Sequence, residues 1–438
     1  MKQILWFRRD LRVKDNALLS IEGEVLPIFI FDKNILESLE KDDRRLSFIW
    51  FYIQKLKNDL KDMGLDLKIL YGDPVDIFKE FKSKGFDRVY ASGDYDAYAI
   101  SRDEKINQII EFEKLNDTYI FAPNEVLKDD GTPYLVFTPF YKKVKSIYTP
   151  SFHLNYEKAK QIQIEIELDT IDSLDQIGFK EVKFDIVDPY EKLEIFKDKI
   201  DEYKEKRDYL DVDFTSHLSV DLRFGTISIR EVVRYLLECK KEGFDTEPFF
   251  RQLIFREFYA YLLFHFPSLQ KENYRYKIDY KNDKDEFTRF CKANTGVPIV
   301  DAGISELFQT GDMHNRVRMI VASFLTKNLQ IFWWWGEQFF AKHLLDYDAS
   351  ANILSWQWSG GTGIDPQPYF RIFNPYTQAK KFDKDAKYIK KWLPLLKEID
   401  PKYLYNEEWL FKNDINGYPK PMVHQKDVKD AFLSRVHK

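Results

Sequence analysis

The runs Ile4-Leu5-Trp6-Phe7 and Val25-Leu26-Pro27-Ile28-Phe29-Ile30-Phe31 decide the fold of the first part of the chain. Both runs are short and almost continuously apolar, which is typical of strands that are buried on both faces of a parallel sheet. Between Asp43 and Met63, apolar side chains recur every three or four residues, so we expect an amphipathic helix that ends at Gly64. Two buried strands followed by such a helix begin an alternating α/β pattern.

The alternation of strand and helix continues to about residue 130. The pattern predicts further strands at residues 67–70, 88–91 and 119–122, and helices at residues 75–81 and 101–113. Strands and helices that alternate at this spacing form a parallel sheet covered by helices on both faces, a Rossmann-like arrangement. Neither GxGxxG nor GxxxxGK occurs, so the usual fingerprints of dinucleotide binding and of a P-loop are absent.

The rest of the chain has a different pattern. Periodicity weakens after residue 130, and the stretch Gln161–Gly178 is polar and irregular, so we expect a long interdomain linker. After about Tyr203 the strand signals disappear, and helices are predicted at residues 228–243, 249–264, 300–308, 312–329 and 333–345. We therefore predict an α/β domain over residues 1–130, a linker over residues 131–200 and an all-α domain over residues 201–438.

Composition limits the class of protein. The chain has 438 residues, enough for two or three domains with large cores, and only 2 cysteines, too few for a disulfide framework. The 7 histidines are scattered without zinc spacing, and no apolar run of about 18 residues occurs, so we expect a cytoplasmic protein with no metal and no membrane segment. A net charge of −5 argues against a uniformly basic nucleic-acid coat but allows a local basic groove. Aromatic residues make up 16% of the chain, and most of its 9 tryptophans follow residue 332, which points to the C-terminal region as the functional one.

Two groups of polar residues in the helical half carry candidate chemistry. Three hydroxyls fall within Thr215–Ser219, at the start of a helical stretch where free backbone N–H groups can bind an anion. An N-cap with spare serines explains the same pattern. Arg316 and Arg318 lie beside an apolar stripe on a predicted helix, so they either contact phosphate or pair with carboxylates along the surface.

A third group, Asp348, Asn352 and Trp356, recurs every four residues, so one helical face presents a carboxylate, an amide and an indole. Such a face is either a satisfied core cluster or a pocket that holds a planar heterocycle by stacking and edge hydrogen bonds. Basic residues are interleaved with aromatic residues farther along, at Arg371 and at Lys380-Lys381. That pattern suits a nucleic-acid groove, and a solvated surface explains it equally well.

Sequence blocks spread over the whole chain carry more information than any single motif. The blocks are Trp6-Phe7-Arg8-Arg9-Asp10-Leu11-Arg12, Thr215 to Ser219, Phe224-Gly225-Thr226-Ile227-Ser228, Arg256-Glu257-Phe258-Tyr259, Thr295-Gly296-Val297-Pro298-Ile299-Val300-Asp301-Ala302, Met313-His314-Asn315-Arg316-Val317-Arg318-Met319, Trp356-Gln357-Trp358 and Tyr369-Phe370-Arg371-Ile372-Phe373-Asn374-Pro375. In order and spacing they resemble the photolyase/cryptochrome flavoproteins, and they are most similar to the class I photolyases that repair cyclobutane pyrimidine dimers. The resemblance implies an α/β antenna domain joined by a long linker to an all-α domain that binds FAD, with UV-damaged DNA as the partner of a monomeric enzyme.

The resemblance assigns residues to the cofactor. The positions that match contacts of the FAD phosphates and ribityl chain are Tyr203, Thr215, Ser216, Leu218 and Ser219. Arg318 and Asp346 match a salt bridge beside the flavin. Asp348 matches a flavin contact, and Asn352 matches the residue that faces flavin N5. An amide facing N5 can follow its protonation and so tunes the fully reduced, active form of FAD.

The resemblance also implies a light-driven electron cycle, in which excited reduced FAD lends an electron to a dimer that has left the duplex. The positions that match the walls and polar contacts of the lesion pocket, or contacts to the DNA backbone, are Gln252, Phe255, Asn315, Arg316, Met319, Trp358 and Arg371. The positions that match the family's electron relay are Trp356 (proximal), Trp333 (middle) and Tyr280 (distal), with Trp334 and Trp335 as alternative exits.

Three positions depart from the family pattern. Gln252 stands where dimer-repair enzymes usually have glutamate, Phe255 where they have a stacking tryptophan, and Tyr280 where they have the distal tryptophan. Glutamine is typical of (6-4) photolyases and animal cryptochromes, so a (6-4) photolyase and a blue-light receptor without repair activity are the alternatives. The (6-4) enzymes use two histidines where this chain has Asn315 and Met319, so dimer repair is the leading prediction.

The stretch Asp94-Tyr95-Asp96-Ala97-Tyr98-Ala99 falls in the region where the family binds a second, light-harvesting chromophore. It lacks the residues that mark a folate site and is more similar to members that use a deazaflavin. The resemblance therefore favours a deazaflavin-type antenna over folate, with an empty antenna site as the alternative.

Overall fold

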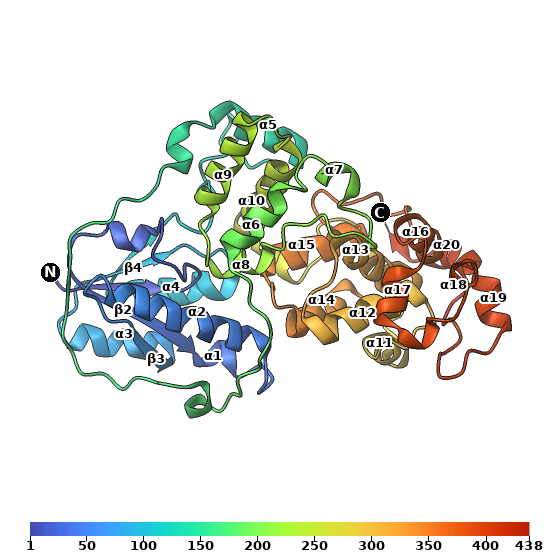
Figure 1. Cartoon of the computed structure of the whole chain (residues 1–438), viewed down its shortest axis with the longest axis horizontal. Coiled ribbons are helices and arrows are strands. Elements are labelled where there is room, and N and C mark those ends of the chain that lie inside the picture. The colour runs from blue at the N-terminus through green and yellow to red at the C-terminus, as the bar shows by residue number, and fades with distance from the viewer. Residues whose placement is uncertain (438) are drawn as a thin grey trace. The chain divides into compact units, whose positions relative to one another are not determined.

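The computed structural model describes residues 1–437, and Figure 1 labels many of its helices and strands. The chain divides into two compact units, each discontinuous in sequence. Unit 1 consists of Met1–Tyr134, Thr138–Asp201 and Ser216–His265; unit 2 consists of Leu135–Phe137, Glu202–Thr215 and the chain from Phe266 onward. The predicted domain limits at residues 130 and 200 differ from the limits of these units and stay a prediction.

Unit 1 is built on a six-stranded sheet. Its strands are β1 (Gln3–Phe7), β2 (Gly23–Asp32), β3 (Lys68–Gly72), β4 (Arg88–Ser92), β5 (Glu111–Leu115) and β6 (Gln161–Gln163). The strand order is β3-β2-β1-β4-β5, β6 pairs with the start of β2, and every pair is parallel. The predicted parallel α/β sheet is confirmed. The strand order reverses between β1 and β4, which is the switch point where open α/β sheets usually bind ligands.

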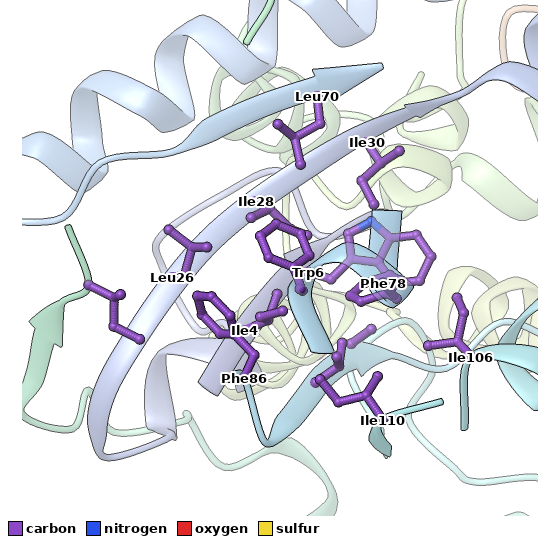
Figure 2. Packing of buried hydrophobic residues seen from close by; sticks show 14 residues of the cluster. Ile4, Trp6, Leu26, Ile28, Ile30, Leu70, Phe78, Phe86, Ile106 and Ile110 are labelled. Atoms are coloured by element: carbon purple, nitrogen blue, oxygen red, sulfur yellow. The ribbon is translucent and has the colours of Figure 1, made fainter. Parts of the chain in front are cut away.

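Apolar side chains fill both faces of the sheet. The helices that follow the first strands are α1 (Lys33–Leu36), α2 (Arg44–Lys61), α3 (Pro74–Ser83) and α4 (Ala97–Asn107). On one face the rings of Trp6 and Phe78 of α3 lie 5.0 Å apart, and Ile106 of α4 joins the same core (Figure 2). On the other face Phe31 lies 6.2 Å from Trp50 of α2. Burial on both faces explains why the strands are continuously apolar instead of alternating.

The fifth strand lies earlier in the sequence than expected. The helix predicted over residues 101–113 ends at Asn107, β5 follows it, and residues 119–122 form bends instead of the predicted strand. The N–H groups of Ile120 and Phe121 donate to the buried carboxylate of Glu257 at 3.0 to 3.3 Å. This apolar run is therefore buried without a strand partner, because a side chain satisfies its backbone.

Three helices from the second half of the sequence belong to unit 1. They are α8 (Ser219–Phe224), α9 (Ile229–Lys241) and α10 (Glu247–His265); the unit also holds most of α5 (Phe137–Ile147) and all of α6 (Pro189–Lys197). The Ser228 hydroxyl caps α9, as its sequence spacing predicts. Arg230 Nη2 lies 2.7 Å from one oxygen of Asp117, and Arg12 Nη2 lies 2.8 Å from the other. These buried ion pairs join α9 to the N-terminal segment.

The stretch expected to be an irregular linker has structure of its own. Residues 161–163 form β6, and Leu174–Ile177 forms a 3-10 turn. Ile164 is 9% exposed and belongs to the core of the sheet. This stretch is therefore not irregular throughout, and a short polar strand at a sheet edge gives no strong apolar signal in the sequence.

Unit 2 is helical apart from the short strands β7 (Lys277–Ile278) and β8 (Val436–His437) within residues 1–437, which confirms the predicted helical domain. Its helices are α7 (Tyr203–Lys206), α11 (Lys284–Cys291), α12 (Pro298–Thr310), α13 (Asn315–Ser323), α14 (Trp333–His343), α15 (Ala349–Gly360), α16 (Pro375–Phe382), α17 (Lys387–Trp392), α18 (Pro401–Leu404), α19 (Glu407–Lys412) and α20 (Gln425–Leu433). The helix predicted over residues 312–329 is α13 followed by a π-helical turn at Phe324–Asn328. None of the helices described, up to residue 437, is long and apolar enough to cross a membrane.

Candidate active site

Helix α15 presents the predicted face of Asp348, Asn352 and Trp356. Asp348 is the N-cap, and its carboxylate accepts hydrogen bonds from the N–H groups of Ser350 at 3.0 Å and Ala351 at 3.2 Å. A side-chain acceptor at this position satisfies N–H groups that have no partner within the helix. The carboxylate therefore fixes the start of the helix that carries the amide and the indole.

Asn352 is buried, and Glu337 of α14 orients its amide. Asn352 Nδ2 donates to Glu337 Oε1 at 3.0 Å and to the Glu337 main-chain oxygen at 3.2 Å. Burial raises the pKa of the Glu337 carboxyl, which also accepts hydrogen bonds from Gln338 and Tyr347. Because Glu337 holds the NH₂ end of the amide, Asn352 Oδ1 is oriented to accept a hydrogen bond from another N–H group.

Arg318 of α13 forms a two-point ion pair with Asp346. The Nη1–Oδ1 and Nη2–Oδ2 distances are 3.1 and 3.0 Å. Asp312 Oδ1 lies 2.7 Å from Nη2, and Nε donates to the main-chain oxygen of Met313 at 2.6 Å. Arg318 is therefore paired with carboxylates, which is one of the two roles that the sequence allowed. Its guanidinium is a positive charge held in a fixed position.

Trp356 is 2% exposed and packs tightly against α14. Its ring lies 4.9 Å from that of Phe340, at 75°. A Cβ atom at Gly336 would lie 2.2 Å from Cη2 of Trp356, closer than real atoms approach. Only glycine at this position lets α14 and α15 come together as they do.

Trp333 is fully buried at the start of α14, and its indole is tied to Asn273. Trp333 Nε1 donates to Asn273 Oδ1 at 2.8 Å, while Asn273 Nδ2 donates to the main-chain oxygen of Tyr276 at 3.2 Å. The hydroxyl oxygen of Tyr280 is buried, and no described residue accepts its proton. The half-buried Trp334 lies 5.7 Å from Trp333 at 89°. The Trp334 ring contacts Trp333 directly, whereas the Tyr280 ring reaches it only through Phe332, which lies 5.3 Å from each of them between ring centroids.

The predicted phosphate and ribityl residues fall in both units. In unit 2, Tyr203 is buried beneath the guanidinium of Arg207 at 5.4 Å, and Thr215 is half-buried. In unit 1, Leu218 is buried and its N–H donates to Ser216 Oγ at 3.4 Å, while Ser219 is exposed at the start of α8.

Three predicted lesion residues lie on two packed helices of unit 2. Asn315 and Met319 are one turn apart on α13, and Asn315 Nδ2 lies 3.9 Å from the Met319 sulfur. Trp358 is half-buried on α15, which packs against α13. An amide and a thioether therefore lie together on α13, and the helix packed against it carries an indole; groups of these kinds suit a planar apolar group with polar edges.

The two arginines predicted to contact DNA differ in their surroundings. Arg316 forms an ion pair with Asp208 at 2.5 Å and lies 4.4 Å from the ring of Phe382. Arg371 is exposed in the loop after α15. A phosphate at Arg316 would have to compete with a carboxylate, whereas Arg371 is accessible to solvent.

Gln252 and Phe255, the two lesion positions that depart from the family pattern, lie on α10 of unit 1. They are three residues apart, so they share one side of the helix. Both are half-buried, and the Phe255 ring lies 5.0 Å from that of Tyr259 at 84°.

Sequence reasoning missed Glu337, Asn273 and Glu257. Glu337 follows Trp333 by four residues, and an acid within an aromatic helix is a signal that could have identified it. Asn273 lies in a polar segment without periodicity and gives no comparable signal. Within residues 1–437 no group of three or more histidine, cysteine or acidic side chains is arranged to hold a metal ion.

The carboxyl edge of the sheet in unit 1 is lined by charged and aromatic side chains. The guanidinium groups of Arg8 and Arg102 lie 4.7 and 4.8 Å from the ring of Trp6. Asp32, at the end of β2, accepts a hydrogen bond from the Tyr98 hydroxyl at 2.6 Å. Tyr98 belongs to the stretch predicted to hold an antenna, so that stretch reaches this edge.

Comparisons with known proteins agree with the sequence resemblance. The family model described as DNA photolyase matches residues 3–159, and the model described as FAD binding domain of DNA photolyase matches residues 249–438. A deoxyribodipyrimidine photo-lyase from Synechococcus is 36% identical over 465 residues, which covers 98% of this chain and 96% of the relative. The chain belongs to the photolyase/cryptochrome family. Another family member, a deoxyribodipyrimidine photo-lyase from Alkalihalophilus pseudofirmus, is 33% identical over 98% of this chain and 96% of its own length.

Solved structures of the photolyase/cryptochrome family have the same fold. A class III photolyase from Agrobacterium tumefaciens is 30% identical, with a TM-score of 0.85 over 99% of this chain and 96% of its own. An archaeal photolyase from Sulfolobus tokodaii, solved with two FAD molecules, is 31% identical, with a TM-score of 0.86 over 99% of both chains. These likenesses confirm a parallel α/β part followed by a helical FAD-binding part.

The residues of unit 2 fit the flavin that this family binds. The fixed Arg318–Asp346 ion pair, the acceptor oxygen of Asn352 and the buried indole of Trp356 are the kinds of groups that hold a polar heterocycle. The orientation of the Asn352 amide is the decisive observation, because Glu337 commits its NH₂ end and leaves a carbonyl oxygen for an N–H group.

Proposed function

We propose that this photolyase repairs cyclobutane pyrimidine dimers in DNA with blue light and FAD. Two lines of support are the relatives named deoxyribodipyrimidine photo-lyase, which match nearly the whole chain, and the residues of α13 and α15. The observation that carries the proposal is the buried Asn352 amide held by Glu337, because it provides an acceptor for the N–H of reduced flavin.

The cofactor site is proposed to combine a fixed charge, an acceptor and hydroxyls. Bound FAD, fully reduced and excited by light, would supply one electron that opens the cyclobutane ring and then returns. Arg318 and Asp346 would orient the flavin ring, Asp348 would contact it, and Asn352 would hold the N5 proton. The residues proposed for the phosphates and ribityl chain are Tyr203, Thr215, Ser216, Leu218 and Ser219.

A second path within unit 2 is proposed to keep the cofactor reduced. Trp356 would donate an electron toward the flavin, and Trp333 would then reduce the oxidised Trp356. Trp334 would reduce the oxidised Trp333 and would itself be reduced by an external thiol. Trp334 is favoured over Tyr280 as the last member because oxidised tyrosine must release its proton, and no described residue accepts a hydrogen bond from the buried Tyr280 hydroxyl.

In unit 2, Met319 and Trp358 are the proposed contacts of the extruded dimer, with Asn315 as a polar contact. In unit 1, Gln252 and Phe255 match lesion contacts by the family resemblance alone. Removing a dimer from the duplex costs a few kcal/mol of unstacking, less than for an intact pair. Apolar and aromatic side chains compensate for part of this cost. The cations proposed for the DNA backbone are Arg316, Arg371, Lys380 and Lys381.

The proposal is tested by illuminating the reduced, FAD-loaded protein with an oligonucleotide that carries one dimer and measuring dimers by chromatography. We expect dimers to disappear in the light and to persist in the dark. A parallel reaction with a (6-4) photoproduct should show no repair. Tight binding of FAD and of the lesion without any light-dependent loss of dimers would contradict the proposal.

The same experiment separates the second candidate, a cryptochrome-type blue-light receptor. Gln252 and Phe255 favour it, since neither is the residue usual for dimer repair. Restoring both in the double variant Gln252→Glu/Phe255→Trp should raise repair yield or lesion affinity if these positions contact the dimer.

The carboxyl edge of the sheet is the proposed antenna site. Arg8, Arg102 and Tyr98 gather at this edge, and the stretch 94–99 favours a deazaflavin-type chromophore over folate. The Sulfolobus relative was solved with two FAD molecules, so a second flavin is the other candidate. Absorption and mass analysis of the chromophores released from protein purified out of its native host would identify the occupant.

A further inference from the structure

Lys327 is a fully buried lysine in the π-helical turn Phe324–Asn328. Its Nζ donates to the main-chain oxygen of Arg371 at 2.8 Å and lies 6.0 Å from the ring centroid of Phe432 in α20. Among residues 1–437 no carboxylate is paired with it. A buried ammonium group without a carboxylate is costly, so the charged form of this lysine is disfavoured unless the hydrogen bond that it donates offsets part of that cost. π-Helical turns inside helices are frequently found at functional sites.

The carbonyl that Lys327 holds belongs to a loop that carries a cation and an aromatic ring at the surface. Arg371 is exposed, and Phe370 before it is 59% exposed. A second anchor lies two residues later, where the N–H of Phe373 donates to Ser323 Oγ at 3.4 Å. The end of α13 and the π-helical turn thus hold the loop from beneath, while its tip faces solvent.

The Lys327 ammonium group therefore lies near a second positive charge, because the carbonyl that it holds belongs to Arg371. Burial and, secondly, the charge of Arg371 lower the pKa of Lys327 to about 7. Arg371 is the one charged group that acts on this pKa among the described residues. The turn packs against α13, α14, α15 and α20, and the charged residues of α20 (Lys426, Asp427, Lys429 and Asp430) are exposed, whereas its Phe432 lies nearest the Lys327 ammonium. Apart from Arg371, no charged group of these described elements acts on the pKa of Lys327. A phosphate bound at Arg371 would offset the repulsion and favour the ammonium form of Lys327.

We propose that Lys327 is a positioning residue for DNA binding, which in its charged form holds the loop through the Arg371 carbonyl and takes up one proton from solvent when Arg371 engages a DNA phosphate. The inference rests on the proposed function, because it requires DNA backbone at Arg371. A neutral lysine donates a weaker hydrogen bond than an ammonium group does, so the loop would be held less firmly at high pH.

The test is equilibrium binding in the dark, measured by fluorescence anisotropy with the FAD-loaded protein and a labelled duplex containing one dimer, between about pH 6 and pH 9. Wild-type affinity should fall as pH rises above about 7, by up to about tenfold per pH unit, as uptake of one proton requires.

Lys327→Met should bind about tenfold more weakly at low pH and lose this pH dependence. Lys327→Gln, which keeps a neutral donor, should recover part of the affinity but not the pH dependence. Lys412→Gln, an exposed lysine of α19, should behave as wild type.

Three further readouts make the outcome decisive. Thermal unfolding of Lys327→Met should occur at the wild-type temperature or higher, since a buried charge is removed, so that weaker binding cannot be a folding defect. Calorimetry of wild-type binding in buffers of different ionisation enthalpy should show proton uptake near pH 7.5, and its absence would overturn the inference even if both variants failed to fold. If wild type binds normally and Lys327→Met keeps the same affinity and pH dependence, this inference alone is overturned. If wild-type protein binds no dimer DNA at any pH, the proposed function is overturned as well.

Discussion

Glu257 of α10 is a buried carboxyl group whose role is structural, and its protonation should make stability depend on pH. Burial raises its pKa to about 7, against the opposing charge of Arg256. Because the folded-state pKa lies above the unfolded value, the stability it contributes is complete below about pH 4.5 and is lost as pH rises through about 7. The size of that loss is about 3 kcal/mol at most. Glu257→Gln keeps an acceptor for the N–H of Ile120, so its free energy of unfolding should change less over this range than that of wild type.

The measurement is chemical denaturation at several pH values, with Glu104→Gln, an exposed acid on α4, as the matched control. The control should follow the wild-type curve. Parallel curves for Glu257→Gln and wild type would mean that Glu257 does not change its protonation in this range.

Residue by residue, the sequence predicted the groups that lie on one helix and missed those that depend on packing between helices. The face of Asp348, Asn352 and Trp356 follows from a spacing of four, and α15 confirms it. Glu337 meets Asn352 only because α14 packs against α15, and no spacing rule connects the two. Lys327 is similar, since nothing in a lysine that follows an apolar stripe indicates full burial against a distant carbonyl.

At the level of elements, the start of α14 decides which aromatic residue ends the electron path. Trp334→Phe should slow light-driven reduction of bound FAD by an external thiol by about tenfold, the effect of about 1.4 kcal/mol on a barrier. Tyr280→Phe should leave this rate unchanged, because the phenol lacks a proton acceptor. Transient absorption should detect an oxidised tryptophan and no tyrosyl radical in wild type. A tyrosyl signal that disappears in Tyr280→Phe would assign the terminal position to the phenol instead.

The contact between α14 and α15 depends on one glycine. A methyl group at Gly336 would meet the rigid ring of Trp356 at 2.2 Å and Cδ2 of Leu325 at 2.5 Å, and both side chains are buried, so neither can move aside freely. Gly336→Ala should therefore destabilise the protein by about 2 kcal/mol, since overpacking costs 1–3 kcal/mol and exceeds the gain in helix propensity. Gly360→Ala, also in a helix but with its nearest contact at 3.6 Å, is the control and should be neutral in thermal unfolding. Equal melting temperatures for the two variants would show that the helices can move apart at no cost.

Elements were predictable where a pattern was long, and uncertain where it was short. The helix predicted over residues 43–63 matches α2, capped by Asp43 and followed by Gly64 in the left-handed region. The run at residues 119–122 is as apolar as a strand, but a carboxylate from α10 satisfies its backbone. The π-helical turn after α13 has a helical pattern in sequence, because one additional residue per turn does not disturb the apolar stripe enough to be noticed.

For the molecule as a whole, the net charge of −5 must be reconciled with binding to DNA. A few local cations are sufficient, and the affinity for dimer DNA should then fall with salt in proportion to the number of phosphates contacted. Lys380→Gln/Lys381→Gln should reduce the slope of log K against log salt by about 2, at roughly 0.9 per phosphate contact. The double variant Lys61→Gln/Lys412→Gln changes the net charge equally at other exposed positions and should keep the wild-type slope. Identical slopes in both variants would remove these two lysines from the DNA site.

The discontinuity of unit 1 also determines how this protein can be divided. Its sheet and the helices α8 to α10 are encoded on either side of residues 202–215, yet Glu257 satisfies the backbone of residues 120–121 and Arg230 is paired with Asp117. A gene fragment that stops near residue 200 would thus encode a sheet with two of its buried hydrogen-bonding partners missing. The architecture looks modular in sequence, but separate expression, domain exchange or a split-protein design would have to cut elsewhere to give pieces that fold.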